Sequence, residues 1–287
     1  MRWVEIEVRA TDASADAVTN ILIEEGCGGT AYNRPSDSIT NVLGYLPVDD
    51  RLEGRLENIR ERVKHLPDFG LELASDEISI KWVQDEEWAT AWKQFFKPMN
   101  IGRIVIKPSW EEYVEREDDL VVEIDPGMAF GTGNHPTTQL CLLALQDYVR
   151  GGETVLDVGT GSGILAIASA KLGATRVVGL DVDTVAVEAA QENVKRMGME
   201  DVIRIDMADS PSAFEGSADI VVANIIANVI IAMADDLIAK VKPGGKLIAS
   251  GIIQDRAEDV KSTLESKGLR LLEDRREGEW VALIMER

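Results

Sequence analysis

Apolar and charged side chains alternate at the start of the chain, and this period of two predicts a strand at residues 3–9. The spacing of apolar residues then switches repeatedly between that of a helix and that of a strand. The further elements predicted in this part are helices at residues 17–22 and 52–63 and strands at residues 30–33, 39–46 and 71–83. The order strand–helix–strand–strand–helix–strand predicts a small ferredoxin-like α+β domain over residues 1–83.

Apolar strands and amphipathic helices alternate through the rest of the chain. Strands are predicted at residues 104–107, 120–124, 155–158, 176–180, 202–205, 220–223 and 246–250, and helices at residues 137–145, 164–172, 185–197, 228–240 and 255–267. Two final strands, at residues 269–275 and 280–285, form a hairpin. This pattern predicts an α/β domain over residues 99–287, a doubly wound parallel sheet with an antiparallel terminal hairpin. A short helix at residues 85–96, within a linker at residues 84–98, joins the two domains.

The net charge of the chain indicates which kinds of partner it can bind. The formal net charge is −21, which repels nucleic acid and anionic membranes and attracts a basic protein. Acidity that serves solubility alone is the alternative. No stretch approaches the ~20 apolar residues of a membrane span, and the opening MRWVEIEVRA lacks the apolar centre of a signal peptide. We therefore expect a cytoplasmic monomer with no direct nucleic-acid or membrane partner.

The chain has two cysteines, Cys27 and Cys141, and they do not form a Cys-x-x-Cys pair. Neither a disulfide framework nor a zinc site is indicated. We expect two buried free thiols and no metal ion.

A glycine-rich segment, DVGTGSG, lies between a predicted strand and a predicted helix. Its glycines are Gly159, Gly161 and Gly163. Glycine allows a sharp turn and a close approach of the backbone to a ligand. The spacing is GxGxG, so the third glycine comes one residue early for the dinucleotide fingerprint GxGxxG. A cofactor without a pyrophosphate therefore fits better, and a glycine-rich turn without a ligand is the alternative.

Two polar residues follow the next strands of the predicted sheet. Asp181 comes about 20 residues after the glycine loop, where a carboxylate can accept hydrogen bonds from ribose hydroxyls. Asp183 is interpreted as a helix N-cap. Asn224 ends a later strand and could orient both a methionine group and an incoming amine, or serve as a turn residue. The loop and the acid leave NAD and S-adenosylmethionine as candidate cofactors.

The segment FGTGNHPTT, residues 130–138, precedes a predicted helix. A helix N-terminus offers free N–H groups and the positive end of the helix dipole, which suits the carboxylate of a methionine moiety. His135, before a proline, is interpreted as structural, and His65 as a surface residue.

The motifs AFGTGNHPTT, DVGTGSGILAIAS, GLDVD and VVANIIA together resemble the ribosomal protein L11 lysine methyltransferase family, and residues 88–110 are similar to its linker region. The resemblance implies a Rossmann-like class I methyltransferase domain and an N-terminal substrate-recognition domain. It implies cofactor contacts by Thr138, Gly159, Asp181 and Asn224, with Phe130, Thr132, Gly161 and Gly163 lining the same pocket. The chain departs from the family pattern at Asn134, usually threonine, and at Asn228, where the family has small residues.

The resemblance also implies an activity: transfer of methyl groups from S-adenosyl-L-methionine to lysine side chains, and to the terminal amine, of the basic ribosomal protein L11. Asn224 would position the amine, and no general base is assigned. The alternatives are methylation of another protein or of a small-molecule amine, an NAD-dependent oxidoreductase, and a non-catalytic cofactor-binding module. The sequence Asn-Ile-Ile-Ala differs from the Asn-Pro-Pro-Tyr type of glutamine and nucleobase methyltransferases.

Overall fold

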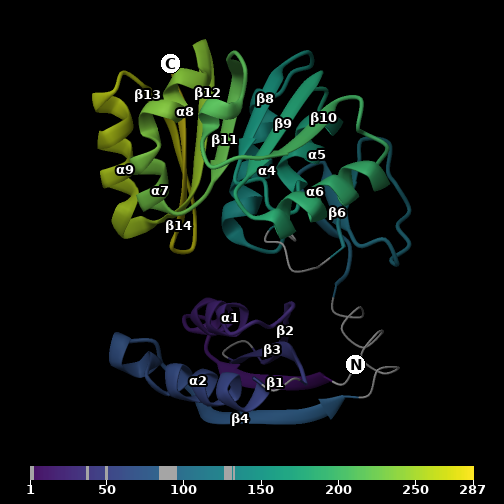
Figure 1. Ribbon diagram of the computed structural model, residues 1–287, viewed down its shortest axis with the longest axis vertical. Helices are drawn as coiled ribbons and strands as arrows, with labels where there is room; N and C mark the ends of the chain where they lie inside the picture. The colour runs from purple at the N-terminus through teal and green to yellow at the C-terminus, as the bar shows by residue number, and fades with distance from the viewer. Residues whose placement is uncertain (1–2, 37–38, 49–50, 84–95, 126–130, 132) are drawn as a thin grey trace. The chain divides into compact units, whose positions relative to one another are not determined.

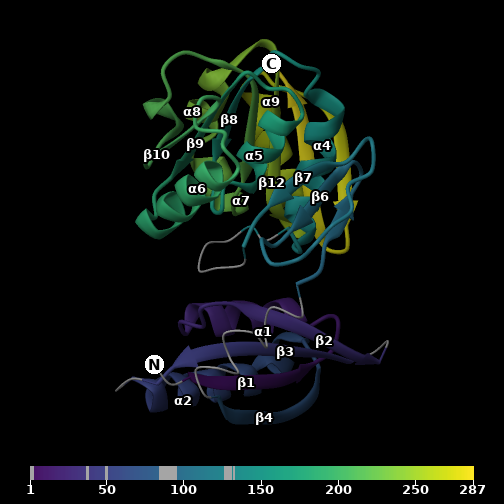
Figure 2. The same ribbon diagram turned by 90° about the vertical axis from the view of Figure 1, so that its right-hand side faces the viewer.

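The computed structural model describes residues 3–36, 39–48, 51–83, 96–125, 131 and 133–287 of the chain. It divides into two compact units, Met1–Lys97 and Pro98–Arg287 (Figures 1 and 2). The helix expected at residues 85–96 falls on residues 84–95, which lie outside the described residues, apart from its last residue.

The first unit is an antiparallel sheet of strand order β2-β3-β1-β4 with two helices. Its elements are β1 (Trp3–Ala10), α1 (Ala15–Glu24), β2 (Thr30–Ser36), β3 (Ile39–Pro47), α2 (Leu52–Lys64), the short 3-10 helix η1 (Leu66–Phe69) and β4 (Leu73–Val83). Alternate residues of β1 point into a core with both helices, where Ile6, Leu22 and Ile59 are fully buried. This is the element order that the hydrophobic pattern predicts.

The second unit contains a seven-stranded sheet of order β10-β9-β8-β11-β12-β14-β13. Its strands are β8 (Thr154–Val158), β9 (Arg176–Asp181), β10 (Ile203–Met207), β11 (Ala218–Asn224), β12 (Val241–Ile253), β13 (Arg270–Glu277) and β14 (Trp280–Glu286). Pairing is parallel from β10 to β12, and β14 is antiparallel to both of its neighbours. The doubly wound sheet and its antiparallel terminal hairpin are therefore confirmed.

Helices cover both faces of this sheet (Figure 1). They are α4 (Pro136–Tyr148), α5 (Ile164–Lys171), α6 (Thr184–Arg196), α7 (Ala227–Ala232), α8 (Ala234–Lys240) and α9 (Gln254–Ser266). The first three pack into one apolar core and the last three into the other, because successive residues of each strand point to opposite faces. From β8 the chain adds β9 and then β10 on one side, and it returns to the other side of β8 with β11. The order of strands therefore reverses between β8 and β11, and ligands bind at such a switch point in folds of this type.

Some boundaries differ from the predicted ones. The helix expected at residues 228–240 is two helices, α7 and α8, separated at Met233. Ile230 and Leu237, one in each helix, enter the same core. A small second sheet of order β5-β6-β7 precedes α4, with β5 (Met99–Ile101), β6 (Ile104–Lys107) and β7 (Leu120–Glu123). The short strand β5 was not predicted.

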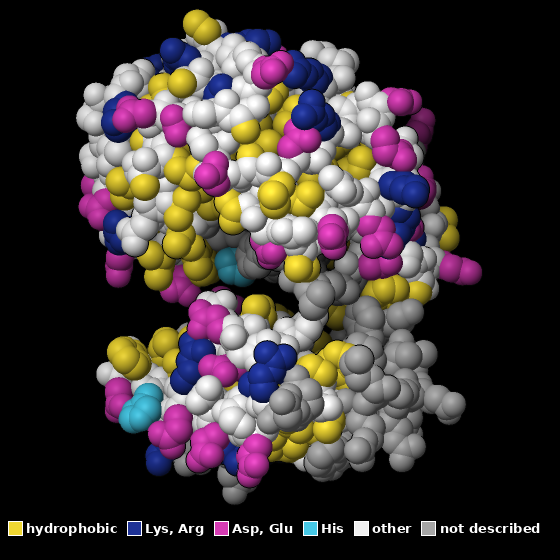
Figure 3. Space-filling view, viewed as in Figure 1, with side chains coloured by type: hydrophobic (Ala, Val, Ile, Leu, Met, Phe, Trp, Pro, Cys, Tyr) yellow, Lys and Arg dark blue, Asp and Glu magenta, His cyan; other side chains and the backbone are white. Residues whose placement is uncertain are grey.

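The surface carries scattered charge. On the face drawn in Figure 3, acidic side chains lie among basic ones on both units and do not gather in a single patch. No helix in the described ranges is long and apolar enough to span a membrane. Cys27 and Cys141 are buried free thiols, as expected, and burial raises the pKa of each to about 12.

Candidate functional site

The ends of three neighbouring strands bring the sequence-predicted residues together. Strand β8 lies between β9 and β11, is parallel to both, and keeps its carboxyl end in step with theirs. Gly159, Asp181 and Asn224 stand at these three ends. The site therefore lies at the switch point of the sheet.

The glycine loop after β8 requires its glycines. Gly159, Gly161 and Gly163 have φ angles of 73°, 55° and 80°, a region that side chains with a Cβ rarely adopt. A Cβ at Gly159 would lie 2.4 Å from Ile225 Cγ2, and one at Gly163 would lie 3.2 Å from Ala190 Cβ. The loop therefore packs closely against both the segment after β11 and helix α6.

Asp181 joins the glycine loop to the end of β9. Its Oδ2 accepts a hydrogen bond from the Gly161 N–H at 2.9 Å, and its Oδ1 accepts one from the Asp183 N–H at 3.1 Å. A carboxylate has about four acceptor positions, so both oxygens can still accept from hydroxyl groups. Asp183 accepts from the Val185 N–H at 2.9 Å and is the N-cap of α6, as predicted.

Asn224 faces the first turn of helix α4. Its Nδ2 donates to Thr138 Oγ1 at 3.3 Å, and Thr138 is fully buried. The Asn224 Oδ1 is also buried, and no group in the described part of the chain donates a hydrogen bond to it. An unpaired buried acceptor costs about 1–3 kcal/mol, so this oxygen is suited to receive an N–H from a ligand.

The start of α4 is set by a histidine cap. His135 Nδ1 accepts from the Thr137 N–H at 3.3 Å, and its ring lies edge-on to Trp280 with centroids 4.8 Å apart. These contacts agree with the structural role expected for His135. The exposed His65 ring lies at the surface beside Asp68. Phe130 and Thr132, both expected to line the pocket, lie outside the described residues.

A second carboxyl group lies beneath the loop. Asp157 is fully buried, and burial raises its pKa to about 7, aided by the nearby charge of Asp181 and opposed by its hydrogen bond from Thr160. That bond joins Thr160 Oγ1 to Asp157 Oδ2 at 2.7 Å. The sequence predicted no separate role for Asp157.

Two more polar residues escaped the sequence prediction. Ser162 and Asn193 are both almost fully buried, and the Asn193 amide donates to the Ser162 carbonyl at 2.9 Å. The available signal was the position of Asn193 on the apolar face of α6, three residues after the buried Ala190.

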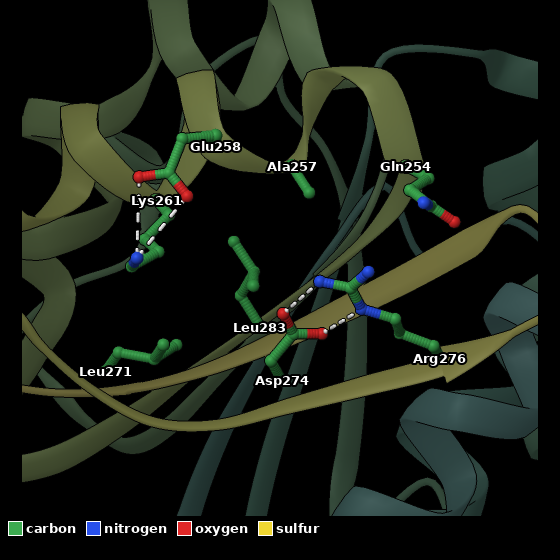
Figure 4. A pocket seen from close by; sticks show the side chains of 8 residues that line it. All are labelled: Gln254, Ala257, Glu258, Lys261, Leu271, Asp274, Arg276 and Leu283. Atoms are coloured by element: carbon green, nitrogen blue, oxygen red, sulfur yellow. Dashed lines mark hydrogen bonds and ion pairs between the residues drawn. The ribbon is translucent and has the colours of Figure 1, made fainter.

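A surface hollow of about 340 Å³ lies between α9 and the β13–β14 hairpin, away from this site (Figure 4). Its charged side chains pair with one another, Arg276 with Asp274 and Lys261 with Glu258. The hollow therefore offers a ligand no unpaired charge from these residues, and the strand ends remain the candidate site.

Known proteins match the whole chain. The model of the family "Ribosomal protein L11 methyltransferase (PrmA)" matches residues 2–287. A relative named ribosomal protein L11 methyltransferase from Alkaliphilus oremlandii is 41% identical, with 99% of this chain and 98% of the relative covered. One of the same name from Pelotomaculum thermopropionicum is 43% identical, with the same coverage. The crystal structure of a ribosomal protein L11 methylase from Lactobacillus delbrueckii subsp. bulgaricus is 34% identical with a TM-score of 0.63, and covers 67% of this chain and 99% of its own.

Proposed function

Because the chain belongs to the ribosomal protein L11 methyltransferase family, we propose that it transfers methyl groups from S-adenosyl-L-methionine to amino groups of ribosomal protein L11. The acceptors are lysine side chains and the terminal amine. The observation that carries the proposal is the buried Asn224 Oδ1 beside Thr138 at the switch point of the sheet, to which no described residue donates a hydrogen bond.

The residues present fit this cofactor. The glycine loop allows close approach of a ligand, and Asp181 has acceptor positions left for the two ribose hydroxyls. At the start of α4, the N–H groups of residues 137–139 are bonded to His135, so a carboxylate would meet the positive end of the helix dipole and the Thr138 hydroxyl, which accepts from Asn224 and can donate. Bound S-adenosylmethionine supplies a methyl group made electrophilic by its sulfonium.

The surface beside Asp181 suits the base of a nucleoside. Val182 follows Asp181 directly, and Met207 pairs with Asp181 across the β9–β10 ladder. Both are apolar and more than 60% exposed. Covering them with a flat aromatic base would remove apolar surface from water.

Asn224 would hold the acceptor amine. A lysine has an ordinary pKa near 10.4 and must lose a proton before its nitrogen can attack. Desolvation against apolar side chains such as the exposed Ile226, two residues after Asn224, favours the neutral amine. The Asn224 Oδ1 accepts one N–H and thereby directs the lone pair along the line of attack. The one proton released is the proton that the lysine loses to solvent before attack, and the bound cofactor would supply the methyl group.

The test is mass spectrometry of purified L11 incubated with S-adenosylmethionine, with and without the protein. We expect the mass of L11 to increase by about 14 Da for each methyl group that replaces a hydrogen, only when the protein is present. Asn224→Ala should lower kcat about 100-fold, the effect of losing one well-placed polar contact. Asn228→Ala, a change four residues later whose side chain instead contacts Arg256, is the matched control. Unchanged transfer by Asn224→Ala would refute the positioning role.

A further inference from the structure

A chain of buried hydrogen bonds crosses the second unit behind the glycine loop. The Asn193 Nδ2, on helix α6, donates to the Ser162 carbonyl at 2.9 Å. The Ser162 Oγ donates to the Gly131 carbonyl at 2.6 Å. Ser162 thus links α6 to the segment that leads into α4.

Close packing leaves these links little freedom. Asn193 is 5% exposed and Ser162 is 3% exposed, so water does not compete for their hydrogen bonds. At Gly131, whose φ is 106°, a Cβ would lie 2.8 Å from the Ser162 Oγ. At Gly163, a Cβ would lie 3.2 Å from Ala190, one turn before Asn193 on α6. Glycines therefore let three backbone segments approach each other, and the two polar side chains hold them there.

The placement of these links matters because a cofactor bound at the strand ends would have two supports. One is the loop at residues 159–163, and the other is the start of α4, which carries Thr138. These supports are separated in the sequence by most of α4 and by β8. The hydrogen bond that Ser162 accepts from Asn193 joins the loop to α6, and the one that it donates to Gly131 joins the loop to the approach to α4.

We propose that Asn193 and Ser162 are positioning residues that fix the glycine loop relative to the start of α4 and so preorganise the cofactor site. This inference rests on the proposed function. Neither side chain touches the reacting groups in this role. Their loss therefore weakens cofactor binding more than it slows transfer at saturating cofactor. Without them, the free energy needed to order the two supports is subtracted from the free energy of cofactor binding.

The test compares variants of the full chain by calorimetric titration with S-adenosylhomocysteine, the demethylated cofactor, and by thermal unfolding without ligand. Asn193→Ala and Ser162→Ala should each raise Kd about ten-fold, the effect expected for one buried hydrogen bond. Their kcat at saturating S-adenosylmethionine should fall less than about three-fold.

Gln191→Ala is the matched control. Gln191 lies on the same helix and also donates from its side-chain amide to a backbone carbonyl, that of Ile205, at 3.1 Å. It should lower Tm to a similar extent and leave Kd unchanged. Binding by both Asn193→Ala and Ser162→Ala as tight as that of Gln191→Ala would overturn the inference. Ser162→Ala removes a single oxygen, so it decides the matter if Asn193→Ala does not fold. Failure of the parent protein to bind the ligand would instead overturn the proposed function, and this inference with it.

Discussion

At the scale of single residues, two carboxyl groups near the site have opposite surroundings. Asp181 is partly exposed and accepts two backbone N–H groups. Asp157 is fully buried, and one of its oxygens accepts a hydrogen bond from Thr160 Oγ1. Burial raises the pKa of Asp157 to about 7, so the charge state of this group changes near neutral pH.

The first prediction concerns the pH dependence of stability. The folded protein keeps the Asp157 proton up to a pKa of about 7, whereas an unfolded chain releases it near 3.8. The native state therefore binds more protons between these values, and this group lowers stability as pH rises from about 4 to about 7. Asp157→Asn should remove that fall, which is at most ~4 kcal/mol. Urea unfolding at pH 5, 6, 7 and 8 measures it, with the exposed Asp201→Asn as control. Parallel pH profiles for parent and Asp157→Asn would contradict it.

The second prediction separates backbone strain from steric conflict in the loop. Gly159 and Gly216 both have positive φ angles, 73° and 90°, but only Gly159 has a neighbour, Ile225, where a Cβ would go. Gly216→Ala should cost about 1 kcal/mol of stability and leave transfer unchanged. Gly159→Ala should cost more and lower kcat, because Ile225 adjoins Asn224. Equal effects of the two variants on kcat would show that the contact does not matter.

Sequence reasoning found the residues whose type and position carry a recognisable chemistry. The glycines, Asp181 and Asn224 each follow a predicted strand. These strands are parallel neighbours in the sheet, so their carboxyl ends lie side by side and the structure brings the residues together. Ser162 and Asn193 were missed because their partners are backbone carbonyls. A backbone partner leaves no residue-type signal, so only the fold identifies it.

At the scale of elements, helix α6 depends on its cap next to the site. Asp183 accepts the Val185 N–H, while Asp181, two residues earlier, serves the glycine loop. Asp183→Ala should cost about 1 kcal/mol, or roughly 2–4 °C in Tm, with little change in cofactor Kd. Asp181→Ala should raise Kd at least ten-fold, because the contacts that we propose with the ribose would be charge-assisted. Thermal unfolding and calorimetry distinguish them, and a larger loss of affinity in Asp183→Ala would reverse the assigned roles.

Most elements could be predicted because each strand and helix has a clear apolar period. The division of residues 228–240 into α7 and α8 could not, because apolar residues continue on both sides of Met233 and no glycine or proline marks the break. Strand β5 has three residues, Met99–Ile101, which is too short for a period to be recognised. β5 is stabilised by its pairing with β6, which depends on the fold and leaves no pattern in its own three residues.

At the scale of the molecule, the net charge of −21 bears on the encounter with the substrate. Acidic side chains are spread over both units on the face seen in Figure 3, so the attraction of a basic protein acts through the overall field. KM for L11 should therefore rise with ionic strength, several-fold between about 50 and 300 mM salt, because screening weakens steering. KM for S-adenosylmethionine in the same assays is the control. A flat response for L11 would leave solubility as the role of the charge.

The two units also suggest that cofactor binding and substrate recognition are carried out by different parts of the chain. Each has its own apolar core, and the described residues proposed to bind the cofactor all belong to Pro98–Arg287. If the first unit recognises the substrate, as we propose, a chain of residues 98–287 should bind S-adenosylhomocysteine with a Kd within about three-fold of the whole protein, yet methylate L11 far more slowly. Calorimetry and mass spectrometry test the two halves of this prediction. Full activity of the shortened chain would assign recognition to the second unit.

The strand order of the large sheet has a consequence for how the protein is made. β14 is synthesised after β13 but lies inside it, paired with β12 on one side and with β13 on the other. While the chain is still emerging from the ribosome, β12 has no neighbour on that side, and an open strand edge invites wrong pairing. The first unit, complete by residue 97, can fold early in translation. The second unit can close its sheet only when β14 has emerged, so the backbone edge of β12 is exposed to chaperones or to aggregation until then.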